Sequence, residues 1–171
     1  MTVCPVAVIG IGNVLLGDEG VGVHVVRALQ AHLGEVAGVE FLDLGLGGLG
    51  LLHALNGRQQ AILVDCTLMD EPPGTLRRFL PAQVRSRKGL ARLSLHESDV
   101  LSLLELANEM GSAPDQVVLF GIQPAETSPG MALSETLRCR LGRYVETLAA
   151  EVRAALAARA GIEEGERPCH L

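Results

Sequence analysis

The sequence predicts a single α/β domain built around parallel strands. Short apolar runs rich in valine and isoleucine alternate along the chain with longer segments of helical period. The chain has 171 residues, the size of one domain, and no linker divides it. Hydrophobic residues make up 48% and charged residues 20%, which is enough for a substantial core and unlike a disordered segment.

Five segments have the composition of strands. The first, a β-branched run, ends at Gly10, and the third is continuously apolar, as in a buried parallel sheet. The fourth follows the turn Pro72-Pro73-Gly74 and is expected at an edge. The predicted strands cover residues 6–9, 39–43, 61–65, 75–80 and 116–122.

Four segments have helical character. One face of the first carries Val21, Val25, Ala28 and Leu29, and one face of the third carries Val100, Leu103, Leu104 and Ala107. The predicted helices cover residues 19–32, 49–55, 97–110 and 133–158. Residues 81–93 show no clear period and are predicted as a loop, and residues 161–171 as a frayed tail of the 1–171 domain.

Composition narrows the class of protein. The formal net charge of −6 argues against general nucleic-acid binding, which requires a basic surface. No apolar run reaches the length of about 18 residues that spans a bilayer, and no secretory signal is visible, so we expect a cytoplasmic protein without membrane insertion. The four cysteines form no Cys-x-x-Cys pair, which argues against a zinc ribbon or a thioredoxin-type redox site.

Three polar residues stand where the predicted elements meet. Glu19 opens the first helix, Asp65 ends the third strand, and His96 is expected in the loop just before the third helix. Ligands of open α/β sheets gather at the carboxyl ends of strands. Two carboxylates and an imidazole there would suit a divalent metal. Taken singly, each residue has a structural alternative, as a helix cap, a turn former or a solvated histidine.

The loop after the first strand resembles a dinucleotide fingerprint only in part. Gly10 and Gly12 fit the pattern, but the third glycine is replaced by Leu15. The acidic pair Asp18 and Glu19 at the predicted helix start would also repel a pyrophosphate. A nucleotide-binding regulator is therefore the weakest of the functional alternatives.

The same loop resembles the opening motif of the nickel–iron hydrogenase maturation proteases. This motif reads Gly10-Ile11-Gly12-Asn13-x-Leu15-Leu16-x-Asp18-Glu19-Gly20-x-Gly22. The resemblance extends in order over about residues 5–155, through Asp43-Leu44-Gly45, Val64-Asp65, Pro73-Gly74-Thr75, Ser94-Leu95-His96-Glu97 and Gly121-Ile122-Gln123-Pro124. It implies a three-layer α/β sandwich, with a twisted, mostly parallel sheet between helices.

The resemblance also implies an activity. Members of this family are endopeptidases that remove a C-terminal extension from the hydrogenase large-subunit precursor after nickel insertion. Their metal-binding and catalytic positions fall on Glu19, Asp65 and His96 of this sequence. We expect the nickel to be supplied by the precursor, because two carboxylates and one imidazole form a weak site compared with thiolates. The alternative is a nickel-sensing assembly factor that docks the precursor without cutting it.

Two positions depart from the family pattern. After Asp43 the family has Gly-Gly-Thr, whereas this chain has Leu44-Gly45-Leu46 and so lacks the threonine hydroxyl. We still expect substrate contacts at Asp43, Gly45 and Gly47, although these glycines can equally serve a tight helix entry. Cys66 replaces a small alanine and is interpreted as a core filler, with a nucleophile beside His96 as the alternative.

Overall fold

The central element of the structure is a five-stranded sheet in the order β2-β1-β3-β5-β4. The computed structural model describes residues 3–86 and 95–165, and the side chains of residues 3–83 and 100–160. The strands are β1 (Val6–Ile11), β2 (Val39–Gly45), β3 (Gln60–Cys66), β4 (Leu76–Phe79) and β5 (Gln116–Ile122). Neighbouring strands are parallel except at the β4–β5 pair, which is antiparallel. The predicted mostly parallel sheet is confirmed, with the fourth strand at an edge as expected.

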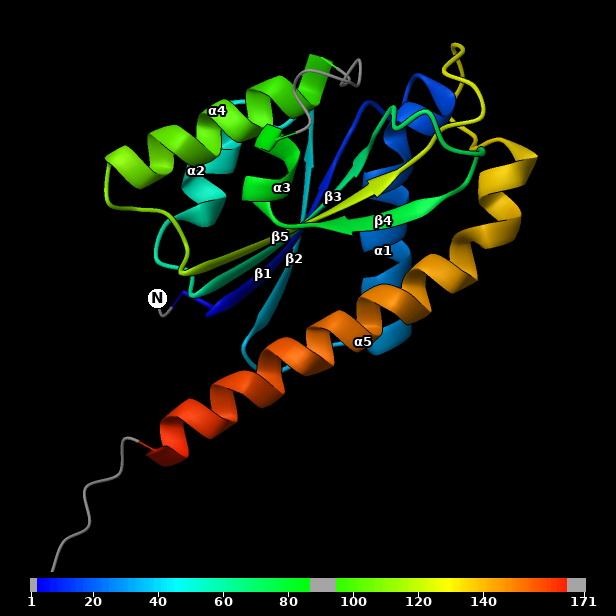
Figure 1. Ribbon diagram of the computed structural model, residues 1–171. Coiled ribbons are helices and arrows are strands. Elements are labelled where there is room, and N and C mark those ends of the chain that lie inside the picture. Colours follow the sequence, from blue (N-terminus) through cyan, green and yellow to red (C-terminus); the bar gives the residue numbers. More distant parts are fainter. Residues whose placement is uncertain (1–2, 87–94, 166–171) are drawn as a thin grey trace, which may run out of the picture.

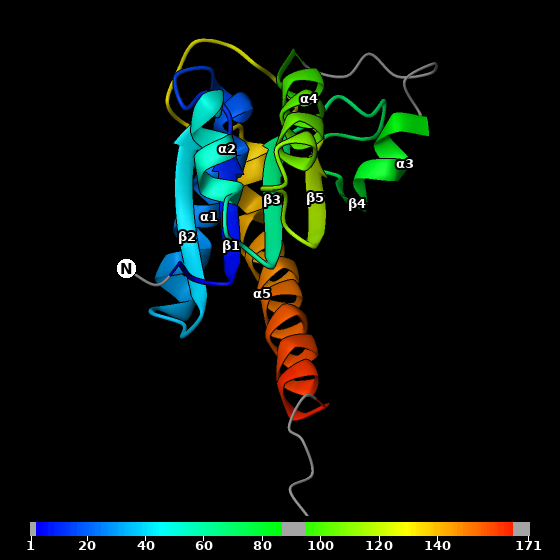
Figure 2. The same ribbon diagram turned by 90° about the vertical axis from the view of Figure 1, so that its left-hand side faces the viewer.

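Helices cover both faces of the sheet (Figures 1 and 2). They are the 3₁₀ helix η1 (Gly17–Gly20) and the α-helices α1 (Val21–Leu33), α2 (Leu49–Leu55), α3 (Pro81–Ser86), α4 (Leu95–Glu109) and α5 (Glu135–Gly165). Figure 2 shows α2 and α4 on one face and α1 and α5 on the other. The predicted three-layer sandwich is therefore confirmed. Among the described residues, no helix is long and apolar enough to cross a membrane.

Side-chain alternation along the strands divides the core into two layers. In β3, Ile62 and Val64 belong to the layer under α1 and α5, whereas Ala61 and Leu63 belong to the layer under α2 and α4. The middle strands are buried on both faces, which explains their continuously apolar sequence. The alternation also places the side chain of Asp65 toward the α2 and α4 layer.

The helical faces predicted from the sequence are the buried ones. In α1 these residues are Val21, Val25 and Leu29, with Ala28 partly buried, and the equally buried Val23 and Val26 were not predicted. In α4 they are Val100, Leu104 and Ala107, with Leu103 partly buried, and the equally buried Leu101 was not predicted.

Most element boundaries differ from prediction by one or two residues, and α3, α4 and α5 show differences with a local reason or a bearing on the site. Residues 81–93 were expected to form a loop, but Pro81–Ser86 forms α3, where Pro81 occupies the first helical position and Gln83 Oε1 accepts a hydrogen bond from the Leu80 amide at 2.8 Å. Helix α4 begins at Leu95, two residues before the predicted start. Helix α5 continues to Gly165, into the predicted frayed tail, because its last turns contain good helix formers such as alanine and glutamate. Residues 87–94 and 166–171 lie outside the described part.

Candidate functional site

The carboxyl ends of β1 and β3 lie side by side in the sheet. These two strands pair in parallel from Val6 and Gln60 onward, so the loop after β1 and the last residues of β3 share one edge. Glu19 lies in η1, which follows that loop, and Asp65 is the next-to-last residue of β3. The structure therefore places both predicted carboxylates at the edge where ligands of parallel sheets bind.

Glycines bring the start of α1 into backbone contact with the strand ends. A Cβ atom added to Gly22 would lie 2.2 Å from the Val64 carbonyl oxygen, immediately before Asp65. One added to Gly12 would lie 2.0 Å from the carbonyl oxygen of Glu19. No side chain fits at such distances, so the glycine pattern that resembled a dinucleotide fingerprint serves close packing. This packing fixes the backbone of Glu19 beside the strand that carries Asp65.

Residue 19 was expected in the first turn of an α-helix, but it lies in a 3₁₀ turn. Gly17 has φ of +58°, and the α-helix starts only at Val21. The tighter turn is anchored by Asp18, whose carboxylate is fully buried. The side chain of Glu19 is half-buried, which leaves part of it accessible to a ligand.

Asp65 is buried, with 8% of its surface exposed, and lines a small cavity. One carboxylate oxygen, Oδ1, accepts a hydrogen bond from the Cys66 amide at 2.8 Å. The cavity measures about 30 Å³, enough for a water molecule, and its other lining residues are mostly apolar, including Ile11 and Phe79. A carboxylate in such a setting can bind a cation or accept a proton.

His96 lies in the first turn of α4, whereas the sequence predicted it in the preceding loop. Its side chain lies outside the described part of the structure. One turn further along α4, Val100 and Leu101 line the same cavity as Asp65. Within residues 3–83 and 100–160, no three histidine, cysteine or acidic residues form a group that could hold a metal ion. The convergence of Glu19, Asp65 and His96 stays a prediction.

Asp18 is an organising residue that sequence reasoning missed. Its Oδ2 accepts hydrogen bonds from the amides of Ala125 at 2.9 Å and Glu126 at 3.2 Å, and its Oδ1 accepts one from Ser134 at 2.7 Å. The carboxylate therefore ties η1 to the loop between β5 and α5. Its place in the opening motif, next to Glu19, was the available signal, and an acidic pair at a helix start is shared with ordinary helix caps.

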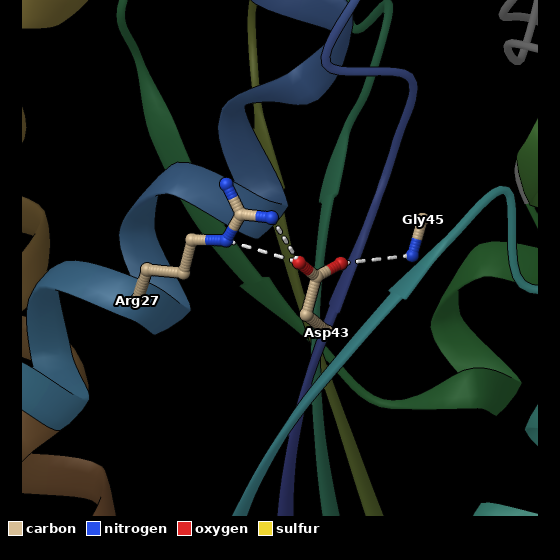
Figure 3. A network of polar contacts seen from close by, with 3 residues as sticks. All are labelled: Arg27, Asp43 and Gly45. Atoms are coloured by element: carbon tan, nitrogen blue, oxygen red, sulfur yellow. Dashed lines mark hydrogen bonds and ion pairs between the residues drawn. The ribbon is translucent and has the colours of Figure 1, made fainter.

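Asp43 is held in a local network at the end of β2 (Figure 3). Arg27 Nε donates to Oδ2 at 3.0 Å, and the Gly45 amide donates to Oδ1 at 3.1 Å. Gly45 and Gly47 have positive φ values of 52° and 71°, so the turn itself requires glycine at both positions. Their predicted substrate contacts, and that of Asp43, stay predictions.

A histidine lies near this network, on α1. The pKa of His24 is lowered, chiefly because burial disfavours the charged ring, with a further contribution from Arg27. A hydrogen bond with the backbone of Met131 and the charge of Asp43 oppose this shift. Its Nε2 is buried and has no hydrogen-bond partner within the described part of the chain. Burial therefore favours the neutral form of the His24 ring.

Cys66 packs in the layer under α1 and α5, together with Val8 and Val64. Consecutive residues of a strand face opposite sides of the sheet, so its thiol and the Asp65 carboxylate lie on different faces. This position supports the interpretation as a core filler and speaks against a nucleophile beside His96, since α4 covers the other face.

Comparisons with known proteins identify relatives of this fold and site. A family model described as hydrogenase maturation protease matches residues 23–151, most of the chain. The chain belongs to the hydrogenase maturation protease family. The predicted family is thus confirmed, although the matched segment starts after Glu19.

Named members of the hydrogenase maturation protease family align over most of the chain. The hydrogenase expression/formation protein HupD of Thiocapsa roseopersicina is 36% identical over 142 residues, 82% of this chain but only 64% of that protein's length. The hydrogenase 2 maturation protease of Escherichia coli is 31% identical over 153 residues, 86% of this chain and 90% of its own.

Solved structures of the family share the fold. The hydrogenase maturating endopeptidase HybD of E. coli superimposes with a TM-score of 0.77 at 28% identity, covering 88% of this chain and 93% of that one. HybD from Thermococcus kodakarensis, a [NiFe] hydrogenase maturation protease, gives 0.70 at 25% identity over 86% and 97%. The predicted class of enzyme, a maturation endopeptidase, agrees with these relatives.

Proposed function

We propose that this protein is an endopeptidase that removes the C-terminal extension of a nickel–iron hydrogenase large-subunit precursor once nickel has been inserted. The observation that carries the proposal is the backbone packing that places Glu19 beside the β3 end holding Asp65, in a chain of the hydrogenase maturation protease family. The nickel belongs to the substrate, and Glu19, Asp65 and His96 would engage it.

The chain's own residues supply distinct parts of this activity. Nickel held by the precursor would polarise the scissile carbonyl. Asp65 lines a cavity large enough for a water molecule and can accept a proton from it, because it is a carboxylate within reach of that space. Glu19 is only half-buried, so it can reach a cation presented from outside. His96 would add a neutral nitrogen ligand.

The decisive experiment is a mass measurement on purified precursor. Nickel-loaded precursor incubated with the protein should lose the mass of its C-terminal extension, whereas nickel-free precursor should keep it. Equal cleavage of both forms would contradict nickel recognition. Cleavage of neither would favour the alternative, an assembly factor that docks the precursor without cutting it.

Variants test the assignment of the site. Glu19→Gln and Asp65→Asn keep the size of each side chain but remove its charge, and each should abolish cleavage. Asp115→Asn is a matched control, since this exposed carboxylate precedes β5 at the opposite edge of the sheet. Wild-type cleavage by either site variant would remove that residue from the mechanism.

A further inference from the structure

Large apolar side chains are exposed on the segments that follow three strands at the edge of the candidate site. Leu15 is 60% exposed, Leu46 61%, Leu49 76% and Met131 68%. They come from the segments after β1, β2 and β5, all at the carboxyl edges of these parallel strands. We call these four side chains the apolar rim. Several large apolar side chains left exposed near a site favour an interaction surface there.

Backbone hydrogen bonds join the loops of the apolar rim into one unit. The Gly17 amide donates to the Gly130 carbonyl at 2.8 Å, and the Gly130 amide donates to the Leu15 carbonyl at 2.9 Å. The Gly12 amide donates to the Gly45 carbonyl at 2.7 Å, which binds the loop after β2 to the loop after β1. Figure 1 shows the loops after β1 and β5 next to each other at the upper edge. The rim is therefore continuous with the loop that leads to Glu19.

Gly50 is a second feature of this edge that the fold does not explain. It lies in the first turn of α2, next to Leu49, and it is not among the residues with positive φ. An added Cβ atom would meet nothing within 4 Å. Alanine would fit there and favour the helix. Gly47 and Gly48 differ from Gly50, because their positive φ values of 71° and 54° favour glycine over any residue with a side chain.

We propose that the apolar rim, with the bare backbone at Gly50, binds the C-terminal segment of the hydrogenase precursor through apolar side chains that flank the scissile bond. The inference rests on the proposed function. A segment that brings its main chain to Glu19 and Asp65 passes next to the rim, because Leu15 and Met131 stand on the segments after β1 and β5, the two strands that flank β3. The four rim side chains carry no charge, so burial of apolar groups is the interaction that they offer. At Gly50 the missing Cβ lets the segment approach the α2 backbone closely.

The test compares rim variants with variants of the same chemistry elsewhere. Leu49→Ser removes an exposed rim side chain, and Leu106→Ser does the same on the exposed side of α4. Gly50→Ala adds a methyl group to the edge, and Gly142→Ala adds one to α5, where nothing lies within 4 Å either. Binding to immobilised nickel-loaded precursor, and to the mature subunit without its extension, is measured with Asp65→Asn present in every protein compared, the reference included, so that the precursor is not cut. The melting temperature of each protein is measured alongside.

We expect Leu49→Ser and Gly50→Ala, the two rim variants, to weaken binding of the precursor about fivefold or more, as central interface positions do. The controls should bind like the wild type. Gly50→Ala should melt at or above the wild-type temperature, so that its weaker binding cannot come from unfolding. Binding of the mature subunit should be weak for every variant.

Several results would overturn the inference. Wild-type binding by both rim variants would show that the segment docks elsewhere, while intact cleavage would leave the proposed function standing. An equal loss of binding to precursor and mature subunit would show that the rim contacts the folded part of the subunit and not its C-terminal extension. A change of oligomeric state in Leu49→Ser would show that the rim binds a second copy of this chain. A wild-type protein that neither binds nor cuts the precursor would refute the proposed function as well.

Discussion

Replacing Asp18 by alanine should strongly destabilise the protein. The buried carboxylate accepts three backbone hydrogen bonds, at 2.7, 2.9 and 3.2 Å. A hydrogen bond to a charged group contributes about 1.5–3 kcal/mol, but three bonds to one carboxylate are not additive, and part of the loss is recovered by water. We therefore expect the free energy of unfolding to fall by about 3 kcal/mol, within the range for the loss of a buried hydrogen-bond network.

Urea and thermal unfolding measure this loss. For a chain of this size, 1 kcal/mol corresponds to about 2–4 °C, so the melting temperature should drop by about 6–12 °C. Asp18→Asn should also lose stability, because its NH₂ group would face amide donors where an acceptor is needed. The exposed Asp115→Ala should change the free energy by no more than about 0.5 kcal/mol. A loss below about 1 kcal/mol for Asp18→Ala, at unchanged m value, would refute the anchoring role.

Three further predictions concern single side chains. The pKa of His24 is lowered in the folded state, so the unfolded chain binds more protons near this residue's ordinary pKa of 6.5. The stability that His24 contributes is therefore complete above that ordinary pKa and decreases as the pH falls below it. His24→Gln should flatten this decrease between about pH 7.5 and 5.5 in urea titrations, and an unchanged slope would contradict the prediction. Tyr144→Phe removes a hydrogen bond from the buried hydroxyl to the Gly74 carbonyl at 2.8 Å and should cost about 1–2 kcal/mol on thermal unfolding, whereas no loss would mean that the bond is replaced. His96→Ala should abolish cleavage of nickel-loaded precursor while changing stability by less than about 1 kcal/mol; wild-type cleavage would exclude His96 from the mechanism.

Much of the fold could be predicted because periodic burial is visible in the sequence. Residues 49–55 and 116–122 were predicted with the bounds that α2 and β5 have in the structure. The buried face of α4 follows from its apolar spacing, since a helix over a sheet must bury one stripe. Helix α3 was missed because it has six residues, too few for a period to appear, although Pro81 and Gln83 mark its start.

The candidate site could be predicted only as residue positions. Glu19 and Asp65 were predicted from their places after strands, and the sheet puts those places at one edge. The long-range contacts of Asp18 have no local signature, because its partners lie 107 to 116 positions away. The packing role of Gly12 could not be predicted either, because close contact of two backbones and phosphate binding both use glycine after a strand.

The distance along the chain between Asp18 and its partners has a consequence for how the protein is made. Ser134 is 116 residues downstream, beyond the last strand of the sheet. A nascent chain can therefore pair all of its strands while the turn that carries Glu19 still lacks its anchor. Closing so long a loop is slow compared with local helix formation. The acidic turn is thus completed late in biogenesis, after the β5–α5 loop has left the ribosome, and an incomplete chain would have a sheet before this turn is anchored.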